Sequence, residues 1–330
     1  MEAPSGVGSI TALTGQNSKQ IFYPFPMHIF QPGDILDEDV YVLHENQYIL
    51  YRPKNLPWTE DNRRHLDRFH YHTLYIQCAA KQFHNRFLEH HLSQVLDEPK
   101  IETARKAKIL YTTSRTVLED LFKRPESPEN LKRSLTTIKH SIEYLSKDKN
   151  HFFELMRLAT KNFSEYTHAL HTAAYSIRLA QHRNIKSFNE LSEIGVGALL
   201  HDIGKIRLPK QILENYGRLT ENEWKEMKRH PMYGYEIVSE SKHVTEPSRL
   251  IILHHHEREN GSGYPRGLSG NDLDFFSRIV ALADSFDLLT SDLPYQPAIK
   301  PKQTIERLQS ELKTERERDL LIDFIKILKE

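Results

Sequence analysis

Histidines and aspartates stand together at the ends of apolar runs in this sequence. In LLHDIGK, residues 199–205, His201 and Asp202 directly follow two leucines. Imidazole and carboxylate groups bind divalent transition metals, and both are costly to bury without a partner. Neighbouring positions on a helix point about 100° apart, so this pair suits two adjacent ions better than one. The pair is therefore a candidate metal site.

Three further segments repeat this arrangement. A lone buried histidine is more often a hydrogen-bonded structural residue, so a single pair is weak support for a metal site. Three other apolar segments, however, also carry ionisable side chains on their apolar faces or at their ends. These are His230, His254 to His256, and Asp284. Four helices then deliver imidazole or carboxylate groups to otherwise apolar faces, which chance burial does not readily explain.

Mixed imidazole and carboxylate ligands indicate hydrolytic chemistry. Two ions about 3.5 to 4 Å apart lower the pKa of a bridging water towards about 7 and hold both oxygens of an in-line displacement. A donor set without thiolate suits iron, manganese, zinc or nickel. Lys205, one helical turn past His201, is placed either to contact a phosphate oxygen or to lie in solvent beyond the helix end.

The candidate ligands are predicted to lie on helices. Ser187 and Glu190 have the spacing of a capping box, and the apolar face that follows reaches Asp202. Gly204 is placed to end that helix. A second capping box starts at Thr220, and its helix is predicted to continue through His230.

A glycine-rich loop, NGSGYP at residues 260–265, follows the third histidine group. Gly261 and Gly263 allow positive φ and a close approach of backbone N–H groups to a ligand, while Pro265 stiffens the exit. Taken alone, the segment is typical of a tight turn after a helix. Beside His255 and His256, it makes Tyr264 a candidate to stack on or hydrogen-bond a nucleotide.

The composition excludes several classes of protein. Lys plus Arg and Asp plus Glu both number 45, so no charge excess indicates binding of long nucleic acid or of an anionic membrane. A single cysteine excludes an intramolecular disulfide and a thiolate metal cage. The chain has no apolar run of spanning length and no signal-peptide pattern at its start, so we expect a cytoplasmic protein without membrane insertion.

The patterning changes along the chain and predicts an α+β protein. Residues 1–20 are small and polar, which is typical of a flexible tail. Residues 21–98 predict a small α/β module with a hairpin, a short helix and a further strand. Two long amphipathic helices connect it, over residues 99–148, to an all-helical domain at 149–330.

The order of the motifs resembles the HD-GYP family of metal-dependent cyclic di-GMP phosphodiesterases. HDIGK, HP, HHE, GSGYP and the aspartate of ALADSFDLLTS follow one another within roughly residues 150–298. The resemblance implies an HD-type metallohydrolase fold with two ions, of which iron is favoured and manganese is the alternative. It implies cyclic di-GMP or a related cyclic dinucleotide as substrate. The N-terminal module is similar to a domain often found before HD-GYP domains, and this module and the GYP loop are the expected contact sites for signalling proteins.

The resemblance also assigns roles to residues of this chain. Asp202 and Lys205 are the implied catalytic residues, and Asp202 is also the bridging ligand. The implied substrate-binding residues are Lys205, Gly263, Tyr264 and Pro265. The implied metal ligands are His168, His201, Asp202, His230, His255, His256 and Asp284.

The first metal ligand has an alternative in the same helix. His168 and His171 lie 33 and 30 residues before His201 and share a helix face, and His168 better matches the family spacing. In the three-metal branch of the family a glutamate stands four residues before this histidine, where this chain has Ser164. Glu165 is one residue away from that position and is expected to point elsewhere. A two-metal centre is therefore predicted.

Two positions depart from the family pattern. In TSDLPYQ, Leu293 replaces an arginine and Gln296 replaces a basic residue, both of which are expected to hold substrate phosphates. A charge-assisted hydrogen bond contributes roughly 1.5 to 3 kcal/mol, so losing two weakens binding unless other residues compensate. Arg266 and Arg278 are nearby cations in the sequence. A domain that has lost catalysis and serves as a metal- or nucleotide-binding interaction module is thus the alternative function, and a general nucleotide phosphohydrolase is a third.

Overall fold

The computed structural model describes residues 21–27, 30, 32–36, 38–78, 88–99, 101–158, 164–215, 217–293 and 296–329. The chain divides into two compact units, residues 1–101 and 102–330. The predicted tail at 1–20 lies outside the described residues. None of the described helices is both long enough and apolar enough to cross a membrane.

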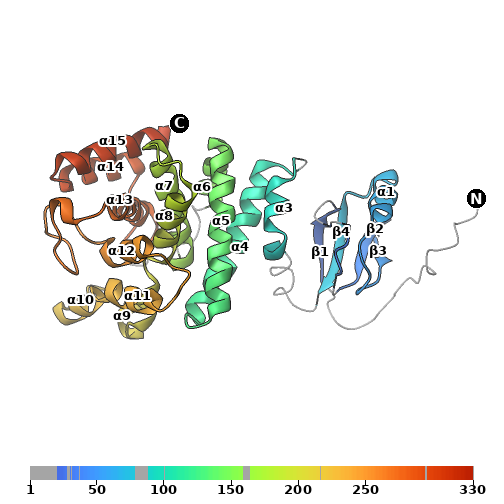
Figure 1. Cartoon of the computed structure of the whole chain (residues 1–330), viewed down its shortest axis with the longest axis horizontal. Coiled ribbons are helices and arrows are strands. Elements are labelled where there is room, and N and C mark those ends of the chain that lie inside the picture. The colour runs from blue at the N-terminus through green and yellow to red at the C-terminus, as the bar shows by residue number, and fades with distance from the viewer. Residues whose placement is uncertain are drawn as a thin grey trace, which may run out of the picture. The chain divides into compact units, whose positions relative to one another are not determined.

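The N-terminal unit contains a four-stranded antiparallel sheet (Figure 1). Its elements are β1 (Ile21–Pro26), β2 (Val40–His44), β3 (Gln47–Arg52), α1 (Glu60–Arg68), β4 (Thr73–Cys78) and α3 (Leu92–Asp97). The strand order is β1-β4-β2-β3. The predicted hairpin is confirmed, since Glu45 and Asn46 both have positive φ and connect β2 to β3 in a two-residue turn. The sequence patterns did not predict β1, which pairs with β4.

The core of this unit forms on one face of the sheet. Trp58, Phe25, Phe30, Leu66 and Ile76 are almost completely buried there. The helix α1 begins at a capping box between Thr59 and Asn62 and contributes Leu66 to this core. The small α+β module predicted from the alternating pattern is therefore present.

The second unit is helical throughout its regular elements. They are α4 (Thr103–Lys123), α5 (Pro128–Lys147), α6 (Lys149–Arg157), α7 (Glu165–His182), α8 (Phe188–Leu200), η3 (Ile203–Arg207), α9 (Lys210–Leu213), α10 (Glu221–Met227), α11 (His230–Ser239), α12 (Glu246–His254), η4 (Gly270–Asp272), α13 (Phe275–Thr290), α14 (Pro301–Glu311) and α15 (Glu315–Lys329). The two long helices predicted over residues 99–148 are α4 and α5. An α+β chain with a helical second unit was the predicted fold class, and it is confirmed.

Four helices in the middle of this unit bring their polar residues together. The helix α8 packs against α7 and α12, and α13 packs against α7 and α12 (Figure 1). The helix α7 is buried along most of its length, because small and apolar residues occupy every face from Ala169 to Ala180. This packing places the start of α7, the ends of α8 and α12, and the middle of α13 around one point.

Two predicted helix boundaries were wrong. The helix α8 ends at Leu200, and the chain passes into the short 3-10 helix η3, so Asp202 lies at a junction and not on a continued helix face. The helix predicted to run from Thr220 through His230 is broken after α10, and His230 is the first residue of α11. Trp224, expected on an apolar face, is 45% exposed.

Gly204 does not end α8, as was predicted, but allows η3 and α11 to pack closely. A Cβ atom at this position would lie 2.0 Å from the carbonyl oxygen of His230 and 2.4 Å from the backbone nitrogen of Gly234. Backbone atoms cannot move away as the end of a flexible side chain can. The close contact therefore fixes the distance between the HDIGK segment and His230.

Replacing Gly204 with alanine should force these two segments apart. We expect the free energy of unfolding to fall by about 1 to 3 kcal/mol, as for other overpacked sites. Gly217→Ala is a matched control, because its added Cβ would meet only the flexible end of the Asn215 side chain, at 3.2 Å. Urea denaturation of the three proteins measures the difference, and equal stability of both variants would contradict the packing role of Gly204.

Candidate metal centre

Asp202 is the side chain around which the other polar groups converge. Its Oδ2 lies 3.2 Å from Nε2 of His201 and 3.8 Å from Nε2 of His168. Its Oδ1 lies 3.2 Å from Nε2 of His230 and 3.9 Å from Nε2 of His255. The two oxygens of one carboxylate thus face two different pairs of imidazole nitrogens. His256 completes the second group, in which all the ligating atoms lie within 4.8 Å of one another.

Backbone carbonyls orient three of these imidazole rings. The Nδ1 atoms of His201, His230 and His255 lie 2.7, 2.8 and 2.8 Å from the carbonyl oxygens of Ala198, Met227 and Ile252. A carbonyl oxygen only accepts hydrogen bonds, so each Nδ1 carries the proton and donates it. With Nδ1 engaged by a carbonyl, the Nε2 atom of each ring faces the centre, as in metal-bound histidines.

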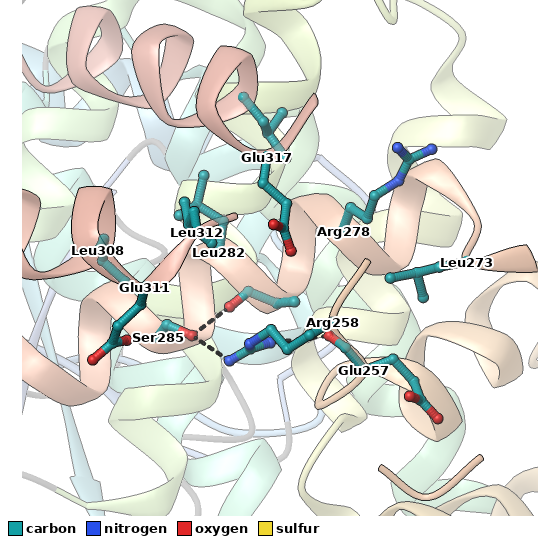
Figure 2. Close-up of a pocket in the computed structure, with 12 residues that line it drawn as sticks. Glu257, Arg258, Leu273, Arg278, Leu282, Ser285, Leu308, Glu311, Leu312 and Glu317 are labelled. Atoms are coloured by element: carbon teal, nitrogen blue, oxygen red, sulfur yellow. Dashed lines mark hydrogen bonds between the residues drawn. The ribbon is translucent and has the colours of Figure 1, made fainter. Parts of the chain in front are cut away.

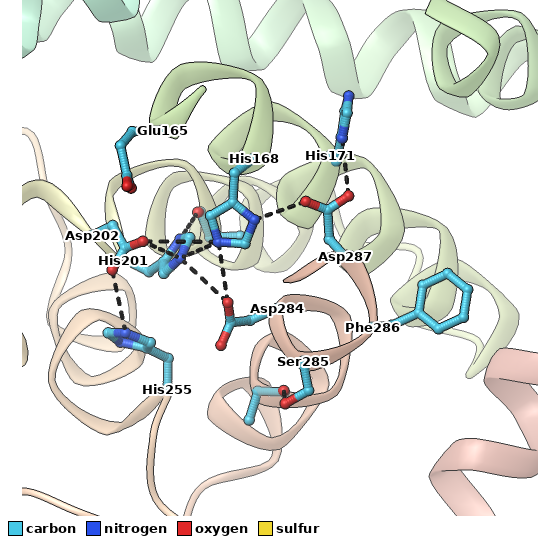
Figure 3. Close-up of polar contacts among 12 residues, drawn as sticks. Glu165, His168, His171, His201, Asp202, His255, Asp284, Ser285, Phe286 and Asp287 are labelled. Carbon is cyan, nitrogen blue, oxygen red and sulfur yellow. Dashed lines mark hydrogen bonds and ion pairs between the residues drawn. The ribbon is translucent and has the colours of Figure 1, made fainter. Parts of the chain in front are cut away.

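His168 is oriented by a carboxylate in place of a carbonyl. Its Nδ1 donates to Oδ2 of Asp287 over 2.8 Å, and its Nε2 lies 3.1 Å from Oδ1 of Asp284 (Figure 3). His171 donates instead to the other oxygen of Asp287, over 2.9 Å. Of the two histidines considered for the first position, the structure brings His168 into the centre and places His171 beside it. Asp287 was missed in the sequence, although its i+3 spacing from Asp284 placed it on the same helix face.

Burial and neighbouring charges shift the pKa values in the centre in opposite directions. Burial lowers the pKa of His255 and His256 well below the usual range, and the neighbouring histidines lower it further. Burial also disfavours the imidazolium form of His168, but hydrogen bonds to Asp284 and Asp287 outweigh it and raise its pKa to about 10. Burial raises the pKa of Asp202, but Lys205 and His201 outweigh it and hold that pKa well below the usual range. The centre therefore combines ionised carboxylates with neutral rings, and a cation can replace the proton shared by His168 and Asp284.

The donor atoms in the centre fit bound metal ions. Asp202 Oδ1 and Asp284 Oδ1 are buried, and each lies within 3.2 Å of an imidazole Nε2, that of His230 and that of His168 respectively. Nε2 of His168 lies 3.2 Å from Nε2 of His201, and Nε2 of His230 lies 3.1 Å from Nε2 of His255. Buried carboxylate oxygens and converging lone pairs are stable together when a cation neutralises them. Nitrogen and oxygen donors without thiolate suit divalent transition metals.

Lys205 lies against the centre and not in open solvent. Its Nζ is 2.7 Å from Asp202 Oδ2 and donates to Glu165 Oε2 over 3.0 Å. Glu165 therefore pairs with Lys205 at the edge of the centre and belongs to neither group of ligating atoms. The Lys205 side chain is 18% exposed and the His256 side chain also 18%, whereas the side chains of the other six predicted ligands are 4% exposed or less. The centre therefore meets solvent near these two residues.

Glu257 holds the GYP loop beside the metal centre. Its buried carboxylate accepts hydrogen bonds from the backbone N–H groups of Arg266, Gly267 and Leu268, over 2.6, 3.1 and 3.0 Å. The loop returns so closely that a Cβ on Gly263 would lie 2.4 Å from the Cα of Glu257. Gly261 has the positive φ that was predicted, at 77°, but Gly263 does not, so close approach explains Gly263.

The GYP loop places Tyr264 on the exposed histidine of the centre. The ring centroids of Tyr264 and His256 are 4.7 Å apart, and the Tyr264 N–H donates to the carbonyl oxygen of His256. The peptide bond from Tyr264 to Pro265 is cis. Burial raises the pKa of the Tyr264 phenol, with Asp284 and Asp202 adding to the effect, so the hydroxyl remains protonated at neutral pH.

A small pocket is lined on one side by Arg278, Leu282 and Ser285 of α13 (Figure 2). Arg258 crosses it and donates to the hydroxyl of Ser285 over 3.0 Å. Arg278 pairs with Glu259 over 3.2 Å, and Glu317 accepts the backbone N–H of Glu259. These contacts fasten the segment that follows the histidine ligands to α13 and α15.

The two departures from the HD-GYP motif lie just beyond α13. Leu293 is buried, and its N–H and carbonyl groups exchange hydrogen bonds with those of Gln296 over 2.9 and 3.1 Å. The intervening residues 294 and 295 lie outside the described residues. Of the two nearby cations, Arg278 is paired with Glu259, whereas Arg266 is exposed.

Comparisons with known proteins agree with this geometry. The family model described as the HD domain matches residues 119–318. The chain is 38% identical over 174 residues to the cyclic di-GMP phosphodiesterase response regulator RpfG of Xanthomonas campestris, covering 52% of this chain and 42% of the relative. It is 35% identical over 159 residues to a cyclic di-GMP phosphodiesterase of Pseudomonas aeruginosa, covering 48% of this chain and 38% of the relative.

Further similarity extends to a relative with a different named substrate and to a solved structure. The 3'3'-cGAMP-specific phosphodiesterase 2 of Vibrio cholerae is 35% identical over 164 residues, covering 49% of this chain and 30% of the relative. The chain thus spans less than half the length of these three curated relatives. An HDG"Y"P protein from Bdellovibrio bacteriovorus has the same fold, with a TM-score of 0.66, 20% identity, and coverage of 94% of this chain and 100% of that one.

The family match covers more than half of the chain, and the HDIGK, HHE and GYP segments lie around one buried group of histidines and aspartates. This chain therefore belongs to the HD domain family and, within it, to the HD-GYP proteins.

Proposed function

We propose that this chain is a metal-dependent phosphodiesterase that hydrolyses a cyclic dinucleotide. The observation that carries the proposal is the position of Asp202, whose two oxygens face two separate groups of imidazole nitrogens. A carboxylate shared in this way is suited to bridge two adjacent ions. The named activities of the relatives from Xanthomonas, Pseudomonas and Vibrio support the same substrate class.

Two groups of ligands would hold the two ions. His168, His201, Asp284 and Oδ2 of Asp202 form one group, and His230, His255, His256 and Oδ1 of Asp202 form the other. Iron is the proposed metal, with manganese as the alternative, because the resemblance to HD-GYP proteins favours these two, and the nitrogen and oxygen donors fit both. When bound, two such ions lower the pKa of water and polarise a phosphoryl group.

The side chains at the edge of the centre would bind and orient the substrate. Lys205 keeps Asp202 ionised and presents a partly exposed ammonium next to the centre, where a phosphate oxygen can approach it. Tyr264 covers His256 with its ring and retains a phenol that can donate a hydrogen bond. Gly263 and Pro265 set the path of the loop that presents Tyr264. We propose cyclic di-GMP as the substrate, with a related cyclic dinucleotide as the alternative.

A specific observation favours a second function. Leu293 and Gln296 supply no charge where basic residues are expected, and Leu293 is buried. A domain with these residues can retain its metals and a weak affinity for nucleotide while serving to contact other proteins. The GYP loop and the N-terminal unit, residues 21–98 in the predicted division, are the proposed contact regions.

The metal assignment predicts about two transition-metal ions per chain in protein purified with iron or manganese. Asp202→Ala should remove nearly all of this metal, because both groups lose a ligand and the charge that both share. Elemental analysis together with protein quantification measures the ratio. Asp61→Ala is the control, since this aspartate is 90% exposed in the N-terminal unit and should leave the ratio unchanged. Full metal content in the Asp202 variant would contradict the bridging role.

The activity assignment predicts that the metal-loaded chain hydrolyses a phosphodiester bond of cyclic di-GMP and so opens its ring. Chelation should abolish turnover, and added Fe²⁺ or Mn²⁺ should restore it. Asp202→Asn should lower kcat by more than about a hundredfold. Replacing even a residue that only hydrogen-bonds a metal ligand typically lowers metal affinity or activity 10- to 100-fold. Chromatography of the nucleotide follows the reaction, with 3'3'-cGAMP as a parallel substrate. A loaded protein that binds either nucleotide without cleaving it would support the interaction module instead.

A further inference from the structure

Lys228 lies at the exposed side of the metal centre with its ammonium over two aromatic rings. Its Nζ is 5.5 Å from the ring centroid of Trp224 and 5.6 Å from that of Tyr264. Both distances fall within the range of cation–π attraction. Among the described residues, Lys228 forms no ion pair with a carboxylate, whereas the adjacent Arg229 pairs with Glu226 over 3.0 Å. Lys228 is therefore a cation held in place by rings and still able to bind an anion.

His256 connects Lys228 and the two aromatic residues beside it to the metal centre. Tyr264 stacks at 4.7 Å on His256, the most exposed of the predicted ligands, and His256 lies 5.0 Å from the ring of His230. His230 follows Lys228 by two residues at the start of α11, so the same short segment carries a ligand and this cation. A ligand that reaches the centre from solvent beside His256 passes Tyr264 and Lys228.

Trp224 adds an aromatic surface that the fold does not use. This side chain is 45% exposed, although tryptophan is costly to leave in water, and it lies one turn before Lys228. An exposed indole beside an unpaired ammonium suits a ligand with both a flat base and a phosphate. Stacking of a base on an aromatic side chain contributes about 1 to 3 kcal/mol.

We infer that Trp224, Lys228 and Tyr264 form a nucleotide-binding subsite, in which Lys228 binds a phosphate and Trp224 stacks on a purine of the cyclic dinucleotide. The inference rests on the proposed function and adds specificity-determining residues to it. In this subsite Lys228 also supplies positive charge, which Leu293 and Gln296 lack. Lys228 and Lys205 would then contact the phosphates in place of the missing basic residues.

Tryptophan fluorescence tests this subsite without relying on catalysis. The chain has two tryptophans, of which Trp58 is 1% exposed and Trp224 is 45% exposed. Titration of the metal-loaded full chain with a phosphorothioate analogue of cyclic di-GMP that resists hydrolysis should quench the emission of Trp224. Trp224→Phe should remove most of this change in signal. Binding by wild type with an unchanged signal would overturn the stacking role.

The charge of Lys228 is tested by calorimetry with the same analogue. Lys228→Ala should weaken binding by about tenfold or more, and the difference should shrink as salt is raised. Lys228→Arg should recover part of the affinity because it keeps the charge. Lys225→Ala is the matched control, since this exposed lysine of the same short helix lies over neither ring, and its effect should be less than about twofold.

The outcomes separate the subsite from the proposed activity. Affinity that depends on Lys228, without turnover of cyclic di-GMP, would support the subsite and contradict the phosphodiesterase. Turnover and binding that are equal in wild type, Lys228→Ala and Lys225→Ala would leave the phosphodiesterase standing and overturn the subsite. Loaded wild type that binds no cyclic dinucleotide would overturn both. Equal metal content in all variants, checked by elemental analysis, confirms that the centre is intact.

Discussion

The helical unit depends on six imidazole and carboxylate side chains that gather around Asp202, five of which are buried. Uncompensated polar groups are costly inside a protein, and converging lone pairs repel one another. Cations resolve both problems at once, and their binding energy then contributes to the stability of the packed helices. The arrangement of α7, α8, α11, α12 and α13 can be understood as the scaffold that makes this binding possible.

The groups that accept hydrogen bonds from the candidate histidine ligands fix the orientation of the imidazole rings. Three histidines donate from Nδ1 to a carbonyl three residues earlier in the chain, so the backbone itself fixes which nitrogen faces inward. His168 receives the same orientation from Asp287, which also binds His171. This shared carboxylate joins α7 to α13. The two helices are therefore coupled by the chemistry of the centre as well as by apolar packing.

The GYP loop connects the centre to solvent. Glu257 follows His256 directly and binds three backbone N–H groups of the loop, so the chain that supplies two ligands also holds Tyr264 in place. The rings of His256, Tyr264 and Trp224 and the ammonium of Lys228 continue outward from there.

The sequence alone determined the fold class, the metal-binding character and the family, because these follow from residue types and their order. HDIGK, HHE and GYP are local patterns, helical periodicity placed His230 and Asp284 on apolar faces, and the spacing of the family indicated His168. Only the tertiary structure decided which atoms meet. The role of Gly204 in contacting His230 and the position of Lys228 beside Tyr264 depend on segments far apart in the chain. Helical periodicity describes one helix at a time. It therefore does not predict which side chains of different helices contact one another.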